Sequence, residues 1–375
     1  GGGVLMSVAK GSGNESLAHK YFSTAMISAA VVSVCFAVFG AIFFDPMMYA
    51  LGADTTNIEL VRGYGLCYTV SAPLFIFSSS LQSFIRNDKS PRHAMIAVLT
   101  GSGLNILLDY LFIFVFKMGM FGASFATSIG TSITVCILII HFFTKKNTMR
   151  FSFRFFSIKA LWEIAKCGFS SFLIECANAV LVFVFNHTLL KYIGSVGVTV
   201  YSIMSNVAVV CMSLFNGVTL AAQPIIATNH GADNHKRVLQ VRHIGTITSS
   251  VIAVIIFCVG FFFPDLLIYS YVKGPTPEIL ELARYALRIY FFAYLFMNFN
   301  IFFSGYFQST LRPVAAITIQ ILRSLLLSSV LVSVLPMIFG ADAIWYAVPI
   351  TECITFFVAM AFLFFGRFQK TKEAK

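Results

Sequence analysis

Long apolar stretches separated by short polar segments dominate the pattern of this chain. Each stretch is about 22 to 26 residues long, and about 20 apolar residues suffice to cross a hydrocarbon core of roughly 30 Å. The pattern therefore predicts ten membrane-spanning helices, with the approximate limits 21–44, 64–86, 93–116, 119–143, 167–192, 199–224, 242–264, 285–309, 314–338 and 342–366. Pro73 and Pro349 fall inside predicted spans, which membrane helices tolerate when neighbours satisfy the freed backbone groups.

The composition narrows the class of protein further. Of the 375 residues 58% are apolar and only 11% are charged, against about 25% charged in an ordinary soluble domain. So few charges cannot cover the surface of a soluble protein of this length, which excludes a soluble enzyme and a disordered chain. The eight cysteines lie almost entirely within apolar stretches and form no CxxC pair, so we expect neither disulfides nor a metal site.

The distribution of basic residues predicts the orientation in the membrane. Nineteen of the 26 Lys and Arg residues fall in one set of loops, six fall in the opposite set, and Arg323 lies inside a span. Cytoplasmic loops carry the excess of Lys and Arg. We therefore place in the cytoplasm the loops 10–20, 86–92, 144–166, 229–242 and 310–313 and the C-terminus. The net charge of +11 is explained in this way, without a nucleic-acid partner.

The two halves of the chain resemble each other. Gly11 and Asn14 match Gly231 and Asn234 at an offset of 220. Gln82 matches Gln308 at an offset of 226, and the loop that follows is shorter in the second half. The matched segments have the same predicted orientation, so they are parallel repeats, a common transporter construction with the site between the halves. We expect an N-terminal lobe over 1–143, a cytoplasmic linker over 144–166 and a C-terminal lobe over 167–375.

The repeat also predicts the start of the first half. The second half begins near Lys159, well before Gly231, whereas only ten residues precede Gly11. A complete first repeat would thus have about 60 further residues at its start, one span and most of another. Residues 1–9 would then be the end of the second helix, and we expect the chain to be N-terminally truncated; the alternative is a native protein of ten spans.

The motifs of both halves resemble the multidrug and toxic compound extrusion (MATE) family. The matching segments keep the order and spacing of the family: GGGVLMSVAKGSGN at 1–14, FFDPMMYALGA at 43–53, LQSFIRNDKSPRHAM at 81–95, GLNILLDYLFIF at 103–114, SNVAVVCMSLFNGVTLAAQPIIATNHGADNHKRV at 205–238 and GADAIWYAVPITE at 340–352. The resemblance implies an all-α integral membrane protein with two lobes of six helices, here with the first helix missing and the second partial. It also implies export of amphipathic organic compounds across the cytoplasmic membrane in exchange for Na⁺ or H⁺.

Ionisable residues inside a bilayer are expensive and indicate function by default. Asp109 lies within a predicted span, and Asn105 is on the same helical face four residues earlier. Carboxylate and amide oxygens suit Na⁺ or a proton relay, and Thr127 offers a hydroxyl at a similar depth in the next span. These three residues match the family's N-lobe polar cluster, which also uses an Asp from the first helix. The alternative role is an interhelical hydrogen bond that only holds the lobe together.

Three further charges lie inside predicted spans of the second half. Glu175 matches a family Glu tied to cation coupling in some branches, although the partner Asp of those branches has no counterpart in 285–309. Its alternative role is an ion pair with Arg323. Arg323 and Glu352 have similar span positions, and we expect them to form a structural ion pair. Asn206 and Gln223 are weaker candidates for lining a substrate cleft, because such residues often only bridge helices.

Other functions fit the sequence less well. A lipid-linked oligosaccharide flippase of the same superfamily would need a cationic cavity for pyrophosphate, whereas the interior of the spans, away from their ends, holds three acids and one Arg. An intramembrane enzyme would need clustered catalytic groups such as HExxH or GxSG, which the sequence lacks, so we do not expect an enzyme. We expect a monomer in the lipid bilayer that handles small organic substrates and has no bound cofactor or metal beyond the coupling ion.

Overall fold

The computed structural model describes residues 1–50 and 54–373, and their side chains except those of 170, 174, 178 and 365–373. Within these residues every regular element is a helix. The end of the motif at 43–53 and the end of the basic C-terminus therefore lie outside the described residues. The helices group into two compact units. We call residues 2–165 the N-unit and the chain from Lys166 onward, with Gly1, the C-unit.

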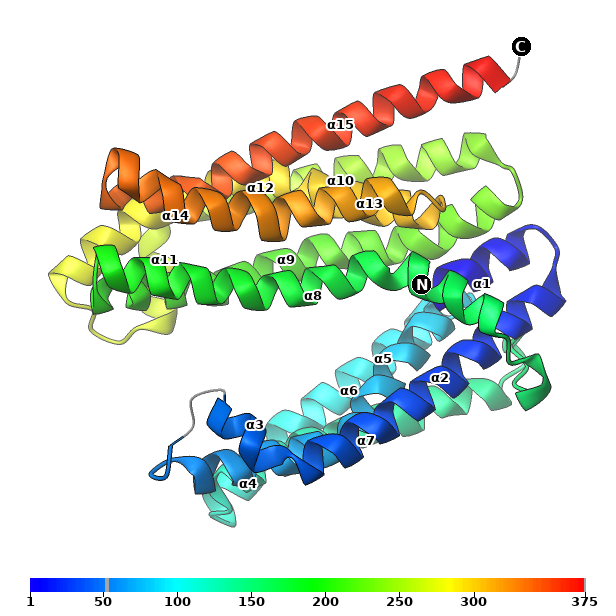
Figure 1. Ribbon diagram of the computed structural model, residues 1–375, viewed down its shortest axis with the longest axis horizontal. Coiled ribbons are helices and arrows are strands. Elements are labelled where there is room, and N and C mark those ends of the chain that lie inside the picture. Colours follow the sequence, from blue (N-terminus) through cyan, green and yellow to red (C-terminus); the bar gives the residue numbers. More distant parts are fainter. Residues whose placement is uncertain (51–53, 374–375) are drawn as a thin grey trace. The chain divides into compact units, whose positions relative to one another are not determined.

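The N-unit is a bundle built around α7, which packs against α4, α5 and α6, while α2 packs against α1, α4 and α5. Figure 1 shows these helices in blue to green-cyan. Their bounds are α1 Gly2–Gly11, α2 Glu15–Ile42, α3 Phe44–Ala50, α4 Ile58–Val70, α5 Ala72–Asn87, α6 Pro91–Asp109 with a π-helical continuation Tyr110–Val115, and α7 Gly119–Ile140, followed by 3₁₀ turns at His141–Phe143 and Phe153–Phe155. The boundary with the C-unit falls inside α8, Ile158–Tyr192.

The C-unit is centred on α12, which packs against α9, α10 and α15 (Figure 1, green to red). Its core is apolar and aromatic, with Tyr294, Phe215 and Trp345 all fully buried. Its remaining elements are α9 Ser195–Gly231, α10 His235–Phe262, α11 Pro264–Tyr271, α12 Pro277–Ser309, α13 Pro313–Gln320, a π-helical segment Ile321–Leu326, α14 Leu327–Phe339, a 3₁₀ turn Ala341–Tyr346 and α15 Ala347–Glu373.

Membrane-spanning helices were predicted over ten stretches. In the described part of the chain nine helices are long and apolar enough to cross a membrane, and a bent pair, α4 and α5, makes ten if it counts as one span. The prediction of one continuous helix over 64–86 is wrong in one respect, because α4 and α5 meet at an angle of 47°. Pro73 explains the break, since it lacks an N–H and its ring clashes with the carbonyl four residues earlier.

The internal repeat recurs in the contacts of the two units. Asn14 accepts a hydrogen bond from the N–H of Leu17 at the start of α2, and Asn234 accepts one from Arg237 at the start of α10. Each cap satisfies a backbone donor that the first turn of a helix leaves unpaired.

A second contact is repeated after each of these helices. Asp45 at the start of α3 binds the guanidinium of Arg62 in α4, and Asp265 at the start of α11 binds that of Arg284 in α12. Both units therefore contain a long helix that is capped by Asn and followed by an Asp–Arg ion pair.

The outer faces of the long helices are apolar. In α2, for example, Val32, Phe36 and Ile42 are more than half exposed. Large exposed apolar surfaces are unusual in soluble monomers but are what the acyl chains of a bilayer would cover. The chain is therefore a multi-pass membrane protein by fold as well as by composition.

Candidate functional site

Two close-packed helices bring the N-unit polar residues together. An added Cβ at Gly101 in α6 would lie 2.5 Å from the carbonyl oxygen of Gly130 in α7, so the two backbones approach as closely as glycine allows. One turn further along, the amide nitrogen Nδ2 of Asn105 donates to the hydroxyl of Thr127 at 3.4 Å. Thr127 also donates to the carbonyl oxygen of Ala123 in its own helix. Asn105 and Thr127 are thus in contact across the α6–α7 interface.

Asp109 lies one turn beyond Asn105, as the last residue of α6 before the chain continues as a π-helix. Its side chain is half-buried, and its oxygen Oδ1 has no solvent access and no hydrogen-bond partner within the described residues. Buried polar atoms are almost always hydrogen-bonded, and an unpaired one calls for an explanation such as a bound ion or water. Single π-helical turns within α-helices also occur frequently at functional sites.

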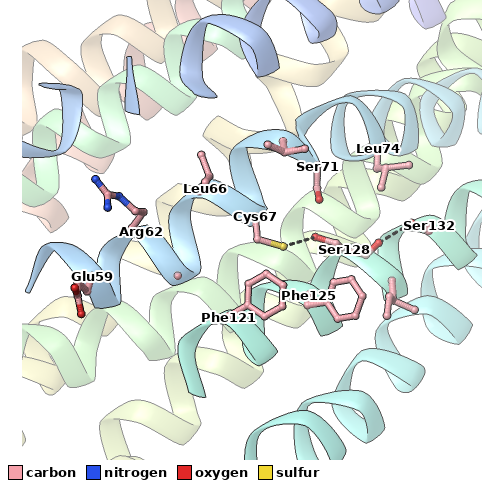
Figure 2. Close-up of a pocket in the computed structure, with 13 residues that line it drawn as sticks. Glu59, Arg62, Leu66, Cys67, Ser71, Leu74, Phe121, Phe125, Ser128 and Ser132 are labelled. Carbon is pink, nitrogen blue, oxygen red and sulfur yellow. Dashed lines mark hydrogen bonds between the residues drawn. The ribbon is translucent and has the colours of Figure 1, made fainter. Parts of the chain in front are cut away.

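The N-unit also contains a pocket of about 800 Å³ between α4, α5 and α7. Figure 2 shows Phe121 and Phe125 beside each other in its wall, with their ring centroids 5.6 Å apart. The polar groups are few: Cys67 Sγ lies 4.0 Å from the hydroxyl of Ser128, and Glu59 is at one end of the pocket. Such a wall suits an apolar aromatic compound with a small number of polar or cationic groups.

The pocket and the Asp109 region lie on different faces of α7. Ser128 contacts Cys67 of α4 on the pocket side, whereas its neighbour Thr127 contacts Asn105 of α6. Successive residues of a helix point about 100° apart, which explains how adjacent residues serve different neighbours. A small displacement or rotation of α7 would therefore change both the wall of the pocket and the contact between Thr127 and Asn105.

The C-unit holds a buried charged cluster. Arg323, in the π-helical segment after α13, donates from Nε to Oε1 of Glu352 in α15 at 2.6 Å, and both side chains are at most 7% exposed. Asn300 of α12 donates from Nδ2 to Oε2 of Glu352 at 2.8 Å and to its backbone carbonyl at 2.9 Å. The structure therefore brings Arg323 and Glu352 together and adds Asn300 of α12, which the sequence did not mark as a site residue.

The remaining site residues predicted in the C-unit are placed differently. Glu175 is exposed on α8. The alternative ion pair of Glu175 with Arg323 does not form, because Arg323 is paired with Glu352. Asn206 is exposed and donates to the carbonyl oxygen of Ser202 in its own helix. Gln223 donates to the side-chain oxygen of Gln308 at 2.9 Å, an interhelical bond between α9 and α12.

A polar network at the end of the N-unit bundle was missed by sequence reasoning. Asp88, after α5, is 1% exposed and accepts hydrogen bonds from Lys10, from His141 Nε2 at 2.9 Å and from both the hydroxyl and the backbone N–H of Thr148. Burial by itself would raise the pKa of Asp88, but the hydrogen bonds from Lys10, Thr148 and His141 outweigh it and hold the pKa below its usual range. A loop position next to a lysine gave no sign that this carboxylate is buried.

Comparisons with known proteins identify the family. The profile of the MatE family matches residues 1–111 and 167–334. The chain belongs to the MatE family. Among its relatives are proteins named multidrug export protein MepA. That of Staphylococcus haemolyticus is 26% identical over 362 residues, which are 96% of this chain and 79% of the relative. That of Staphylococcus saprophyticus is 26% identical over 376 residues, covering 100% of this chain and 82% of the relative.

Solved structures support the fold assignment. One described as an outward-facing multidrug resistance MATE family transporter of the MOP superfamily superposes with a TM-score of 0.91 at 19% identity, covering 99% of this chain and 83% of that one. A MOP superfamily transporter from Pyrococcus furiosus, whose description refers to a binding pocket of reverse polarity, gives 0.90 at 19% identity over 100% and 83%. At this identity the likeness shows the fold, which is that of a MATE transporter, as the motifs of the sequence predicted.

Proposed function

We propose that this protein is a cation-coupled antiporter that exports drugs or other amphipathic organic compounds across the cytoplasmic membrane, and that it is not an enzyme. The observation that carries the proposal is the carboxylate of Asp109, half-buried in a predicted membrane span with an unpartnered Oδ1. Membership of a family of multidrug export transporters supports the same function.

Asp109 has the chemistry that coupling requires. A carboxyl group can bind either a proton or a metal ion, and an intramembrane carboxyl is a typical ion-pathway residue. Asn105 lies one turn away on α6, and the hydroxyl of Thr127 on the facing helix contacts Asn105. If two conformations of the transporter differ in their affinity for that ion, its gradient drives the cycle, whereas equal affinities would shift nothing.

The pocket between α4, α5 and α7 supports the proposed substrate class. Its aromatic and aliphatic wall accepts apolar rings, and Glu59 at one end provides a carboxylate for a cationic group. A flippase for a pyrophosphate-linked lipid would instead need a net positive wall. The single Arg of this pocket, Arg62, is accompanied by Glu59 and is bound to Asp45. The pocket thus favours drug export over the flippase alternative.

The test is transport in membrane vesicles with Na⁺ and proton gradients imposed separately. We expect Asp109→Asn, which keeps the shape and removes the titratable charge, to abolish gradient-driven dye efflux while expression remains near the unmodified level. Asn105→Ala should raise the ion concentration needed for half-maximal efflux without abolishing it, because the carboxyl group of Asp109 remains. The wild-type protein should respond to one of the two gradients.

The matched control is Asp342→Asn, which removes an acid of the same type from an exposed position in the 3₁₀ turn before α15. This variant should transport normally. Full gradient-driven efflux by Asp109→Asn would refute the coupling role, and the residue would then serve only to hold α6 in the bundle.

A further inference from the structure

A second, smaller pocket of the N-unit is lined mainly by basic residues, whereas the wall of the first is largely apolar. The second pocket has a volume of about 550 Å³ and is formed where the turn between α5 and α6 meets the end of α7. Four of its lining residues are basic, namely Lys89, Arg92, Lys145 and Lys146, and no acid lines it. Both of the segments that supply them belong to the loops predicted to lie in the cytoplasm, where positive charge accumulates.

The basic charge of this pocket is not neutralised by its own surroundings. The adjacent carboxylate is Asp88, and its two oxygens are already occupied by Lys10, His141 and Thr148. The lysine and arginine side chains of the pocket are exposed, and none of them has an ion-pair partner within the described residues. Like charges gathered around one cavity repel each other, and a bound anion would relieve that repulsion.

Ser90 is the feature that turns this basic patch into a built site. It lines the pocket, is only 6% exposed, and its hydroxyl has no hydrogen-bond partner in the part of the chain that the structure describes. It occupies the N-cap position of α6 without capping that helix. A serine there normally accepts from a backbone N–H of the first turn. Pro91 has no N–H, and the N–H groups of His93 and Ala94 donate to the carbonyl oxygen of Ser90. Among the described residues, the hydroxyl of Ser90 and the backbone N–H of Arg92 are therefore the two donors of this first turn that have no partner.

These groups match the chemistry of a phosphate. A helix N-terminus offers N–H donors and a positive dipole end to an anion, and phosphates bind there in many folds. The hydroxyl of Ser90 adds a donor, and Lys and Arg add charge-assisted hydrogen bonds. His93 completes the wall with a fixed ring, since its Nε2 donates to the carbonyl oxygen of Ile137 at 2.8 Å.

Apolar side chains beside the pocket indicate the source of the phosphate. On α6, Ile96 and Leu99 are 53% and 63% exposed one to two turns from the pocket, and Phe143 beside Thr144 is 85% exposed. These residues belong to the surface that acyl chains cover in a bilayer. Basic pockets at the cytoplasmic side of membrane helices bind anionic headgroups. We infer that this pocket binds the phosphate of an anionic phospholipid of the inner leaflet, with its acyl chains along the outer face of α6.

The second repeat shows that the turn does not need these charges in order to form. Lys89 has a positive φ of 61°, and Leu311 at the equivalent place before α13 has 55°, so the backbone follows the same path in both units. There, however, Leu311 replaces Lys89 and Arg312 replaces Ser90. Neither Lys89 nor the free hydroxyl of Ser90 is therefore needed for the turn to form, and the second repeat offers a control.

The test measures lipid binding by the purified protein in detergent micelles, as the shift in the midpoint of thermal unfolding during titration with a short-chain lipid. A ligand that binds only the folded protein raises this midpoint with concentration. We expect short-chain phosphatidylglycerol to bind at least tenfold more tightly than short-chain phosphatidylcholine or inorganic phosphate. Raising the salt concentration should weaken the binding, because the contacts are ionic.

The variants test the assigned groups. Replacing Lys89, Arg92, Lys145 and Lys146 together by Gln should weaken phosphatidylglycerol binding at least tenfold. Ser90→Ala, which should fold like the wild type because the hydroxyl has no internal partner, should weaken it about threefold. Arg312→Gln removes one positive charge from the equivalent turn of the C-unit and should leave binding unchanged.

Two results would overturn the inference. If the Ser90→Ala and the fourfold variants bind phosphatidylglycerol as the wild type does, the pocket is not the site. If inorganic phosphate binds as tightly as phosphatidylglycerol and loses its binding in the same variants, the pocket is a phosphate site but its ligand is a soluble anion and not a lipid. The measurement needs no transport, so its outcome is independent of the proposed drug export.

Discussion

The buried pair Arg323–Glu352 shows how one residue depends on another far along the chain. Glu352 receives Arg323 on Oε1 and Asn300 on Oε2, so both carboxylate oxygens are paired. Taking two charges out of water is costly, and only such close, hydrogen-bonded geometry compensates for it. The pair thus contributes little net stability, but either member alone would be an unpaired charge in the core.

Removing one partner should therefore cost more than removing both. We expect Arg323→Met or Glu352→Met to lower the free energy of unfolding by about 3–5 kcal/mol each. The double variant should be clearly less destabilised than the sum, because no charge is left unpaired. A double-mutant cycle on thermal unfolding in detergent measures the coupling, and additive effects would reject the pairing.

At the scale of the helices, close packing decides which polar groups meet. Gly101 and Gly130 let α6 and α7 touch through their backbones, and the next residue on the same face of α6 as Gly101 is Asn105, which contacts Thr127. A bulkier residue at either glycine would separate the helices and carry Asn105 away from Thr127. The small residues are thus part of what positions the proposed ion site.

Gly101→Ala tests this interface. Its new Cβ would lie 1.9 Å from the hydroxyl of Thr134 and 2.5 Å from the carbonyl oxygen of Gly130, and a backbone atom cannot move aside as a flexible side chain can. We expect a fall of about 1–3 kcal/mol in stability, as in other overpacked cores, and reduced efflux. Gly103→Ala is the control on the same helix, since nothing lies within 4 Å of its added Cβ. Equal effects of the two variants would contradict the interface argument.

At the scale of the whole chain, the two units share one construction but differ in the Asp88 network. Asp88 connects the end of α1, the end of α5, the turn after α7 and the segment that follows, and thereby closes one end of the N-unit. The matching residue of the C-unit is Thr310, which bonds to carbonyl oxygens of its own helix. The N-unit alone therefore depends on a buried carboxylate at this point.

This dependence gives the N-unit a defined response to acid. The pKa of Asp88 lies below its ordinary value of 3.8, because its hydrogen bonds outweigh the cost of burial. A carboxyl with a lowered pKa in the folded state stabilises the protein fully above about pH 4–5 and loses this contribution as the pH falls through the lowered value. Asp88→Asn should cost about 2 kcal/mol at neutral pH and should remove this part of the acid sensitivity.

The measurement is the midpoint of thermal unfolding against pH for the wild type and the variant. The difference in midpoint between the wild type and Asp88→Asn should be constant at neutral pH and should become smaller below about pH 4. Asp233→Asn is the control, because the side chain of Asp233 is 87% exposed and should change stability by less than about 0.5 kcal/mol. A gap that does not change with pH would show that Asp88 does not act through its charge.

Helices, repeat and family followed from the sequence alone because they depend on local patterns. Apolar length predicted each span, and the matched residues Asn14 and Asn234 cap matched helices in the structure. The break before α5 also has a local cause, namely Pro73. The sequence by itself, however, did not show that α4 and α5 would meet at an angle of 47°. Patterns of this kind are set within a few residues of the chain.

Only the tertiary structure decided which side chains meet. The sequence left Arg323 with two acids as partners, and the packing of α12, α13 and α15 assigned it Glu352. The tertiary structure likewise buried Asp88 between Lys10 and Thr148, which are 138 positions apart in the chain. It left the hydroxyl of Ser90 without a partner among the described residues. The physical reason is that contacts between helices depend on the rotation of each helix about its axis, which close approach of the backbones sets and apolar length does not.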